Sequence, residues 1–399
     1  MISIMNSNLL SDPVSISNKL CMTHVLYSGL GGHSAVLFSL LEGGFMADAL
    51  HTVLFVGVES PPNEYTRRCD ELQVAWRHVP KVANKGHLKF LLALRRQLVV
   101  NEPDILFMHG LAAMPAVVLL KFFRLRRKPF VLVRETQANH LKSRRDWISL
   151  VLAHWFANRI VHLTEEAATG AVLSLGHLIR PAKVSIVPNG LDTEYFKPIE
   201  ACGAIQGVIH IGMQSRLQPN KDHATLICAF KLLCQRNPNR CFHLHIAGDG
   251  STFQVIKQQI KELGFTKRTT LHGMLDQNSL RDFLNGLNIY VHCTHGETMS
   301  TAIMQALSCG LPVIASDVAG VANMVQPEVG LLYNPGDPID LADKLDDLVC
   351  NPLKAQKWRQ RARSYALKHY AISATVIAWQ ALIPDYKANA VLPKDLSPP

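Results

Sequence analysis

Residues 295–315 read HGETMSTAIMQALSCGLPVIA and place a carboxylate just before a helical pattern. The pattern predicts an apolar strand over 288–292, a polar turn that holds Glu297, and a helix capped by Ser300 or Thr301. Free backbone N–H groups and the helix dipole favour negative charge at such a helix start. We therefore predict that this turn binds an anion such as a diphosphate, with Glu297 placed beside it to hold hydroxyl groups.

Two cations, Arg216 and Lys221, follow an apolar run over 208–213. The carboxyl end of a parallel strand is where open α/β sheets bind ligands. Fixed positive charges there would stabilise the charge that develops on a departing diphosphate. The alternative is that both are exposed loop cations that bind nothing.

Glycine-bearing turns follow three more predicted strands and indicate close approach of a ligand to the backbone. The candidate residues in these turns are Gly31, Gly32, Gly248, Asp249, Gly273 and Met274. The first turn is not the dinucleotide fingerprint, because its third glycine is missing at the required offset. His109 follows the strand at 105–108 and could donate to a sugar hydroxyl or a developing oxyanion. Ordinary tight turns and an ordinary histidine are the alternatives.

Strand and helix patterns alternate along the chain, which predicts parallel sheets with helices on both faces. Strands are expected over 22–28, 50–57, 76–79, 105–108, 130–134, 159–163, 184–187, 208–213, 242–247, 270–272 and 288–292. Helices are expected over 33–42, 85–101, 115–127, 222–236, 253–263, 279–286 and within 352–382. Pro, Gly and polar residues over 188–192 and 198–207 predict a linker.

Composition sets the broad class. A chain of 399 residues with 48% hydrophobic residues exceeds the usual single core and predicts two domains. No apolar run approaches the ~20 residues that span a bilayer, and residues 1–19 lack the apolar stretch of a secretory signal. Nine cysteines without metal-ligand spacing indicate reduced thiols and a cytoplasmic protein. No D-x-D pair, Walker loop, G-x-S-x-G or H-E-x-x-H motif is present, so no metal or cofactor is predicted.

Positive charge is concentrated in the first half of the chain. Residues 1–190 carry 21 Lys and Arg against 13 Asp and Glu, whereas residues 191–399 carry 20 against 18. Basic residues lie among Phe and Leu over 121–128 and recur over 142–145. We interpret this as peripheral contact with an anionic membrane surface, since no nucleic-acid motif accompanies the charge. A merely solvated basic face is the alternative.

With these residues in order, the chain resembles the family 4 retaining glycosyltransferases of GT-B fold, over nearly all of residues 22–385. The resemblance implies two Rossmann-like α/β lobes whose parallel sheets face each other across a cleft, and a C-terminal helix that crosses back to the first lobe. The implied parts are a disordered extension (1–21), an acceptor-side lobe (22–197), a donor lobe (198–370), the returning helix (371–388) and a tail (389–399).

The resemblance also implies roles for particular residues. Arg216 and Lys221 would hold the diphosphate, Glu297 would contact the donor sugar, and His109 would lie near the transferred sugar. The remaining implied donor-side positions are Gly31, Gly32, Asn189, Gly248, Asp249, Gly273, Met274, Ser300, Thr301, Ala302 and Gln305. Gln305 departs from the family, whose E-x7-E motif has a second glutamate there that takes the ribose hydroxyls. An amide can still accept and donate hydrogen bonds, which predicts altered binding of the nucleotide-sugar donor. The segment after residues 130–134 also departs from the family's histidine-led pattern, on the acceptor side.

The function implied is metal-independent transfer of a hexose-type sugar from a nucleotide-diphosphate sugar, UDP rather than GDP. The acceptor would be a saccharide or lipid-linked saccharide in polysaccharide or lipopolysaccharide synthesis, at the inner face of the membrane. Two alternatives remain open at this point. One is a non-catalytic nucleotide-sugar-binding partner subunit, and the other is a nucleotide-sugar 2-epimerase of the same fold.

Overall fold

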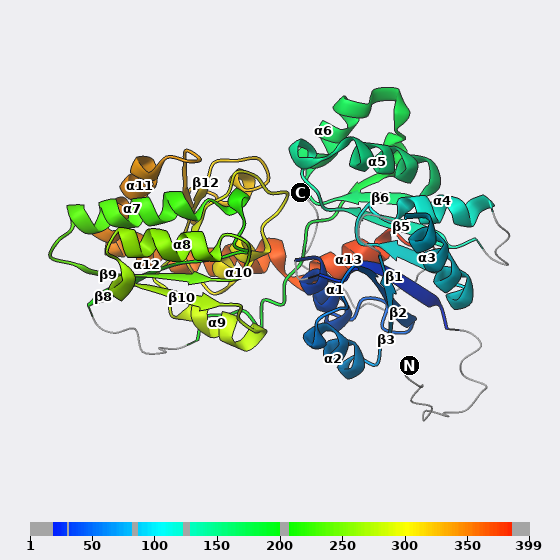
Figure 1. Ribbon diagram of the computed structural model, residues 1–399, viewed down its shortest axis with the longest axis horizontal. Helices are drawn as coiled ribbons and strands as arrows, with labels where there is room; N and C mark the ends of the chain where they lie inside the picture. Colours follow the sequence, from blue (N-terminus) through cyan, green and yellow to red (C-terminus); the bar gives the residue numbers. More distant parts are fainter. Residues whose placement is uncertain (1–18, 30–31, 82–86, 123–127, 200–206, 385–399) are drawn as a thin grey trace. The chain divides into compact units, whose positions relative to one another are not determined.

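A computed structural model describes residues 19–29, 32–81, 87–122, 128–199 and 207–384 of the chain. These residues form two parallel sheets with helices packed on them (Figure 1). The backbone divides into two compact units, and each is described by itself: unit 1 is Met1–Glu135 with Arg145–Ile160, and unit 2 is Thr136–Arg144 with Val161–Pro399. The predicted lobe boundary, the cleft and the returning helix remain predictions.

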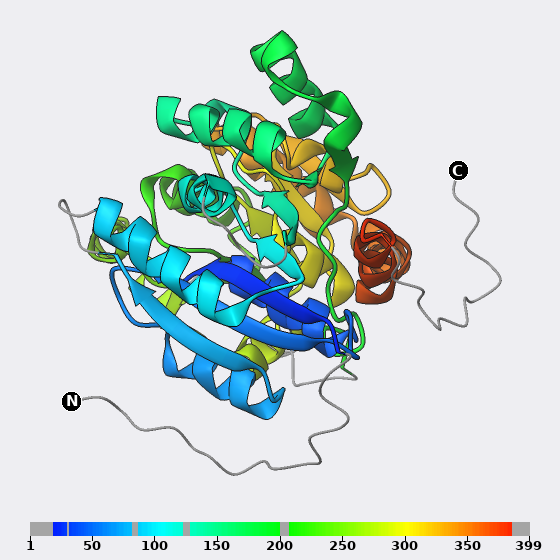
Figure 2. The ribbon, with the colours of Figure 1, turned by 90° about the vertical axis from the view of Figure 1, so that its right-hand side faces the viewer.

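The first sheet has the strand order β3-β2-β1-β4-β5-β6-β7. Its strands are β1 (Cys21–Tyr27), β2 (Leu50–Gly57), β3 (Ala75–Pro80), β4 (Ile105–Met108), β5 (Phe130–Glu135), β6 (Arg159–His162) and β7 (Val184–Ile186). Figure 2 shows the strands from β3 to β5 side by side, and their pairing is parallel. The order reverses between β1 and β4, which creates a switch point where ligands bind in open α/β sheets.

The second sheet repeats this plan with the order β10-β9-β8-β11-β12-β13. Its strands are β8 (Val208–Gln214), β9 (Cys241–Ala247), β10 (Thr269–Gly273), β11 (Ile289–His292), β12 (Val313–Ser316) and β13 (Gly330–Tyr333). All neighbouring pairs are parallel. The switch point falls between β8 and β11, whose carboxyl ends lead into the loops that carry Lys221 and Glu297.

Helices cover both faces of the second sheet. On one face α7 (His223–Arg236), α8 (Phe253–Glu262) and α11 (Pro338–Cys350) bury Phe230, Ile256 and Leu345 against the strands. On the other face α9 (Gln277–Asn285), α10 (Thr301–Ser308) and α12 (Pro352–Tyr370) bury a second apolar cluster. Full burial of one large apolar side chain stabilises a fold by about 1.5–3 kcal/mol, so these two clusters hold the loops at the strand ends in place.

The remaining helices are α1 (Gly32–Glu42), α2 (Asn63–Glu71), α3 (His87–Asn101), α4 (Met114–Phe122), α5 (Arg144–Phe156), α6 (Glu165–Leu175) and α13 (Ile372–Ala381). In unit 1, α1 and α2 pack on β2 around a cluster that includes Phe38, Phe55 and Tyr65. In unit 2, α13 begins where the backbone of Leu191 bridges Ala371.

All predicted strands are present, with ends that differ by one residue at most. The sequence pattern missed α2, α5, α6, α11 and β13. The exposed face of α2 interrupts the apolar period with charged residues, and β13 is a four-residue strand. Residues 1–18, 123–127 and 385–399 lie outside the described part, and with them most of the predicted extension and all of the predicted tail.

Within the described part, no helix combines the length and the hydropathy that crossing a bilayer requires. The eight cysteines placed there are free thiols.

Candidate active site

Lys221 is held by the loop between β8 and α7. After β8 ends, the Ser215 N–H donates to the Ala247 carbonyl (3.0 Å), and Pro219–Lys221 form a 3-10 turn. Asp222 follows in the left-handed region (φ 36°) and caps α7 by accepting from the Thr225 N–H at 3.3 Å. This tight turn directs the Lys221 side chain inward, where it is only 7% exposed.

Glu297 lies in the loop between β11 and α10, and this loop is tied to the Lys221 turn. The Asn220 carbonyl accepts from the His295 N–H (2.9 Å) and from the Thr294 hydroxyl (3.1 Å). A third support is Gly320, at φ +79°, where a Cβ would come within 2.1 Å of the Glu297 carbonyl oxygen. Only glycine fits this approach, so the sequence around residue 320 also fixes the Glu297 loop.

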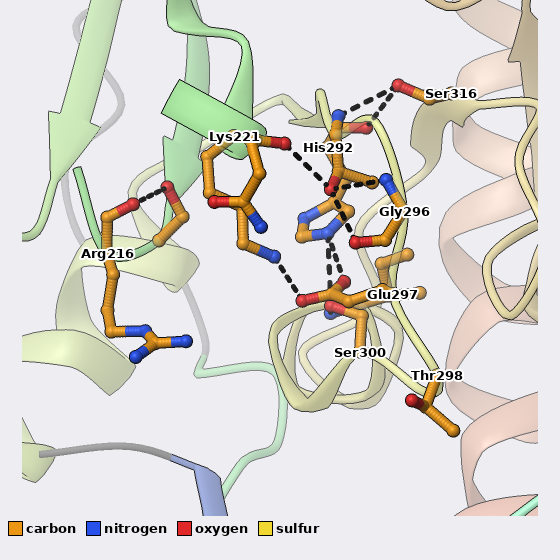
Figure 3. Close-up of polar contacts among 12 residues, drawn as sticks. Arg216, Lys221, His292, Gly296, Glu297, Thr298, Ser300 and Ser316 are labelled. Atoms are coloured by element: carbon orange, nitrogen blue, oxygen red, sulfur yellow. Dashed lines mark hydrogen bonds and ion pairs between the residues drawn. The ribbon is translucent and has the colours of Figure 1, made fainter. Parts of the chain in front are cut away.

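Glu297 bridges two basic side chains (Figure 3). The Lys221 ammonium donates to Glu297 Oε1, and His292 Nε2 lies 2.7 Å from Oε2. Burial acts to raise the pKa of Glu297, but the charges and hydrogen bonds of His292 and Lys221 hold that pKa well below its usual range. The carboxylate is therefore ionised at neutral pH and can accept hydrogen bonds from hydroxyl groups.

The helix start beside Glu297 is capped as the sequence predicted. The Ser300 hydroxyl accepts from the Ile303 N–H (3.4 Å) and lies 3.2 Å from His292 Nε2. Thr301 and Ala302 form the first turn of α10, where backbone N–H groups have no intrahelical acceptor. A helix N-terminus therefore lies next to the ion pair, and its polarity favours an anion.

Arg216 lies in the same loop as Lys221 but is exposed. Figure 3 shows its side chain extended, and its guanidinium forms no ion pair with any carboxylate in the described part of the chain. The loop backbone is fixed by the Leu217 N–H, which donates to the Asp249 carbonyl at 2.9 Å. Gly248, at φ +129°, permits this contact because a Cβ there would lie 1.9 Å from the Ser215 carbonyl oxygen.

The remaining predicted positions of unit 2 are described in turn, beginning at the carboxyl end of β10. Gly273 ends β10 and its carbonyl accepts from the Gly248 N–H at 2.7 Å, and Met274 beside it is 53% exposed. Gln305 is buried in α10, where its Oε1 accepts from Gln214 Nε2 at 2.5 Å. The Asn189 N–H donates to the Met299 sulfur at 3.4 Å.

Three predicted positions belong to unit 1, which is described by itself. His109 directly follows β4 at the switch point of the first sheet, where it is buried with its Nε2 3.2 Å from His24 Nδ1. Gly32 begins α1. Gly31 lies outside the described residues.

Sequence reasoning missed His292 and His223. His292 is the last residue of β11, and that position at the carboxyl end of a parallel strand was the available signal. His223 is the first residue of α7, and its Nε2 lies 3.0 Å from the Ser215 hydroxyl. The spacing of His223 and Ser215 along the sequence does not reveal this contact.

The comparisons with known proteins show the family and the fold of the chain. The sequence model of Glycosyltransferase Family 4 matches residues 30–195, and that of Glycosyl transferases group 1 matches residues 204–365. The chain belongs to the family 4 glycosyltransferases, and its fold is the two-lobed α/β GT-B fold. It is therefore a transferase by family.

Curated relatives are similar over part of their length. The phosphatidylinositol N-acetylglucosaminyltransferase gpi3 subunit of Schizosaccharomyces pombe is 29% identical over 196 residues, which are 49% of this chain and 42% of that protein. The D-inositol 3-phosphate glycosyltransferase of Frankia alni is 28% identical over 48% of this chain and 51% of that protein. The chain thus spans about half the length of these relatives.

A solved structure supports the fold over nearly the whole chain. Anabaena Alr3699/HepE in complex with UDP and glucose superposes with a TM-score of 0.76 at 18% identity, covering 90% of this chain and 97% of that one. The lipopolysaccharide outer core galactosyltransferase WaaB gives a TM-score of 0.67 at 16% identity, covering 91% and 99%. At these identities the likeness concerns the fold alone.

Proposed function

We propose that this protein is a retaining glycosyltransferase that moves a hexose-type sugar from UDP-sugar to a saccharide or lipid-linked saccharide. The observation that carries the proposal is the joining of Lys221, Glu297 and the capped start of α10 at one switch point. A cation and free N–H groups suit a diphosphate, and an ionised carboxylate suits sugar hydroxyls.

In the proposed reaction the bond between the sugar and the diphosphate breaks while the acceptor hydroxyl attacks from the same face. The departing phosphate oxygen takes the acceptor proton, so no separate enzyme base is required. Arg216, Lys221 and the N–H groups of Thr301 and Ala302 stabilise the negative charge that grows on UDP. Glu297 and His109 orient the sugar. We propose that no metal takes part, since these groups can supply the positive charge.

The choice of UDP draws on Anabaena Alr3699/HepE, which was crystallised with UDP and glucose. Gln305 is proposed to contact the ribose hydroxyls through its amide, in place of the family's glutamate. The other donor-side positions, Gly248, Asp249, Gly273 and Met274, would form the surface for the base. A role in polysaccharide or lipopolysaccharide synthesis is part of the same proposal.

Membrane contact is proposed for one face of α3 rather than for the basic segments alone. Its exposed side chains include Leu88 (65%), Leu92 (47%) and Val99 (36%), together with Lys89 and Arg96, and α3 contains no Asp or Glu. These positions recur at helical spacing and make a basic, apolar stripe that fits an anionic lipid surface. We refer to Leu88, Lys89, Leu92, Arg96 and Val99 as the α3 face.

The basic segments at 121–128 and 142–145 support membrane contact less strongly than α3 does. The Lys142 ammonium donates to the Gln137 carbonyl (2.5 Å) and to Asn139 Oδ1 (2.9 Å), so it is engaged within the protein. The side chains over 121–127 lie outside the described part.

The test is UDP release from UDP-sugars with and without acceptor, before and after EDTA treatment. The acceptor panel includes oligosaccharides, lipid-linked saccharides and, because of the names of the two relatives, phosphatidylinositol and inositol 3-phosphate. Acceptor-dependent release with retention of the anomeric configuration, unaffected by EDTA, is expected. Donor binding without turnover would instead identify a non-catalytic subunit, and conversion of donor without acceptor would identify an epimerase.

A further inference from the structure

Three histidines on neighbouring strands of the first sheet form a continuous hydrogen-bonded chain. The Met46 carbonyl lies 3.0 Å from His51 Nε2, and His51 Nδ1 lies 2.9 Å from His24 Nε2. His24 Nδ1 in turn lies 3.2 Å from His109 Nε2. His51 is on β2, His24 on β1, and His109 directly after β4, so the chain crosses the switch point of this sheet.

The positions of the protons along these hydrogen bonds follow from the end at the Met46 carbonyl. A carbonyl oxygen only accepts, so His51 Nε2 must carry the proton and donate to Met46. A neutral imidazole has one N–H, which leaves His51 Nδ1 as the acceptor for the His24 Nε2–H. His24 Nδ1 is then an acceptor in its turn, and it receives the Nε2–H of His109. The proton of His109 is therefore on Nε2, and its Nδ1 carries a lone pair.

This order requires all three imidazoles to be neutral, and their surroundings favour that state. His24 and His109 are 0% and 4% exposed. Burial lowers the pKa of each of the three histidines; the neighbouring His51 adds to the effect for His24, and His24, Arg134 and His33 add to it for His109. Hydrogen bonds to the Met46 and Phe45 carbonyls oppose the shift for His51 only in part.

The end of the chain is an unused acceptor. His109 Nδ1 is buried and has no hydrogen-bond partner among the described residues. A buried acceptor without a donor is unfavourable, and a hydroxyl group of a bound sugar would supply the missing hydrogen bond. With this order of protons, His109 Nδ1 can accept from a sugar hydroxyl but cannot donate to a hydroxyl or to an oxyanion.

We propose that His24 and His51 are positioning residues that fix the His109 tautomer, so that Nδ1 accepts a hydrogen bond from a sugar hydroxyl. The sugar contact rests on the proposed function, whereas the tautomer rests on the contacts of unit 1 alone. Neither His24 nor His51 needs to touch the substrate. Each acts by holding the next nitrogen as an acceptor, and the site thereby selects a sugar that presents a hydroxyl to Nδ1.

The test is ¹⁵N NMR of histidine-labelled protein, with the His109 signals assigned by their loss in His109→Gln. The wild-type spectrum is expected to show His109 protonated on Nε2 and not on Nδ1 across the neutral range. A wild-type spectrum with the proton on Nδ1 overturns the proposal, and this measurement needs neither a variant nor activity.

Two variants then test the link to catalysis. His51→Phe keeps a ring but removes the acceptor, so His24 can protonate Nδ1 and donate to His109, which shifts the His109 proton to Nδ1. His51→Asn keeps an acceptor oxygen near the position of Nδ1. We expect about a tenfold loss of kcat/KM and a reversed tautomer for His51→Phe, with both restored in His51→Asn.

An unchanged His109 tautomer in folded His51→Phe, or a reversed tautomer with full kcat/KM, would refute the positioning role. If His51→Phe does not fold, the His109 tautomer in the wild-type spectrum and the tautomer and kcat/KM of His51→Asn test the positioning role instead. Absence of turnover in wild type with every donor and acceptor would count against the proposed function, not against the tautomer.

Discussion

The Lys221 ammonium and the Glu297 carboxylate form an ion pair across 76 residues of sequence, with the lysine almost fully buried. Each group neutralises the other, and His292 adds a second contact to the carboxylate at 2.7 Å. A diphosphate at the start of α10 would therefore compete with Glu297 for the ammonium. Release of one carboxylate oxygen would leave it free to accept from a sugar hydroxyl, so binding of the two parts of a donor would be coupled.

Glu297→Gln should reduce kcat by about 10²–10³ while leaving the fold intact. The amide has the same shape but no charge, so it orients hydroxyl groups poorly and leaves Lys221 without a counter-charge. Steady-state kinetics with saturating donor measure the loss. The matched control is Glu262→Gln, which changes an exposed glutamate at the end of α8 and should keep wild-type kcat. Normal turnover in Glu297→Gln would remove this residue from the proposed site.

Arg216→Gln should weaken catalysis without changing the melting temperature. The guanidinium is exposed, so its loss leaves no buried group unpaired, whereas transition-state charge on the diphosphate loses one donor. Removal of such a donor typically costs about 3–4 kcal/mol of barrier. Turnover and thermal unfolding are compared with those of Lys257→Gln, an exposed cation of α8. A large drop in melting temperature would indicate a structural role instead.

Gln305→Glu should strengthen donor binding. The substitution restores the carboxylate of the family motif, and Gln214 Nε2, now 2.5 Å from the Gln305 oxygen, can donate to it equally well. Charge-assisted hydrogen bonds to two ribose hydroxyls are stronger than those of a neutral amide, and a three- to tenfold fall in KM for donor corresponds to ~1 kcal/mol. Gln305→Leu is the opposite control and should raise KM. Equal KM for all three proteins would mean that residue 305 does not touch the ribose.

His223 should make stability depend on pH. Burial lowers the pKa of His223 to about 4, with Lys221 and His292 adding to the shift. The folded protein binds this proton less readily than the unfolded chain, whose histidine titrates near 6.5. The contribution to stability is therefore fully present above about pH 6.5 and is lost as the pH falls toward 4, by up to ~1.4 kcal/mol per pH unit.

Urea unfolding at intervals between pH 7 and pH 4 measures this slope. His223→Gln should make it shallower, whereas His177→Gln, which changes an exposed histidine, should not. The other buried histidines contribute to the slope in both variants, so only the difference between them is diagnostic. An identical slope in wild type and His223→Gln would contradict the prediction.

The α3 face should bind anionic vesicles in a salt-sensitive manner. Replacing Leu88 and Leu92 by Ser removes exposed apolar area, and replacing Lys89 and Arg96 by Gln removes the charge that attracts acidic lipid. Cosedimentation with vesicles of phosphatidylglycerol and phosphatidylcholine should fall several-fold in each double variant. Lys257→Gln combined with Lys261→Gln in α8 is the charge-matched control. Equal sedimentation of all variants, or none of the wild type, would refute membrane contact by this face.

Much of the architecture was determined by local sequence. Alternating apolar runs and helical patterns located the strands from β1 to β11 to within a residue, because their buried side chains must recur at these spacings. Ser300 capped α10 as expected, because a hydroxyl at this position satisfies a free N–H of the first turn. Helices such as α2, which consist mostly of polar residues, lack a recurring apolar pattern and were not predicted.

Only the tertiary structure decided which side chains meet. Lys221 and Glu297 were predicted for the same site but not as partners, and no spacing rule indicates that His292 would hold the same carboxylate. The hydrogen-bonded series from Met46 through His51 and His24 to His109 joins three separate stretches of sequence, and of its histidines only His109 was a candidate from the sequence. Parallel strands bring distant residues to one edge, and the order of the strands, which local patterns do not encode, determines which ones.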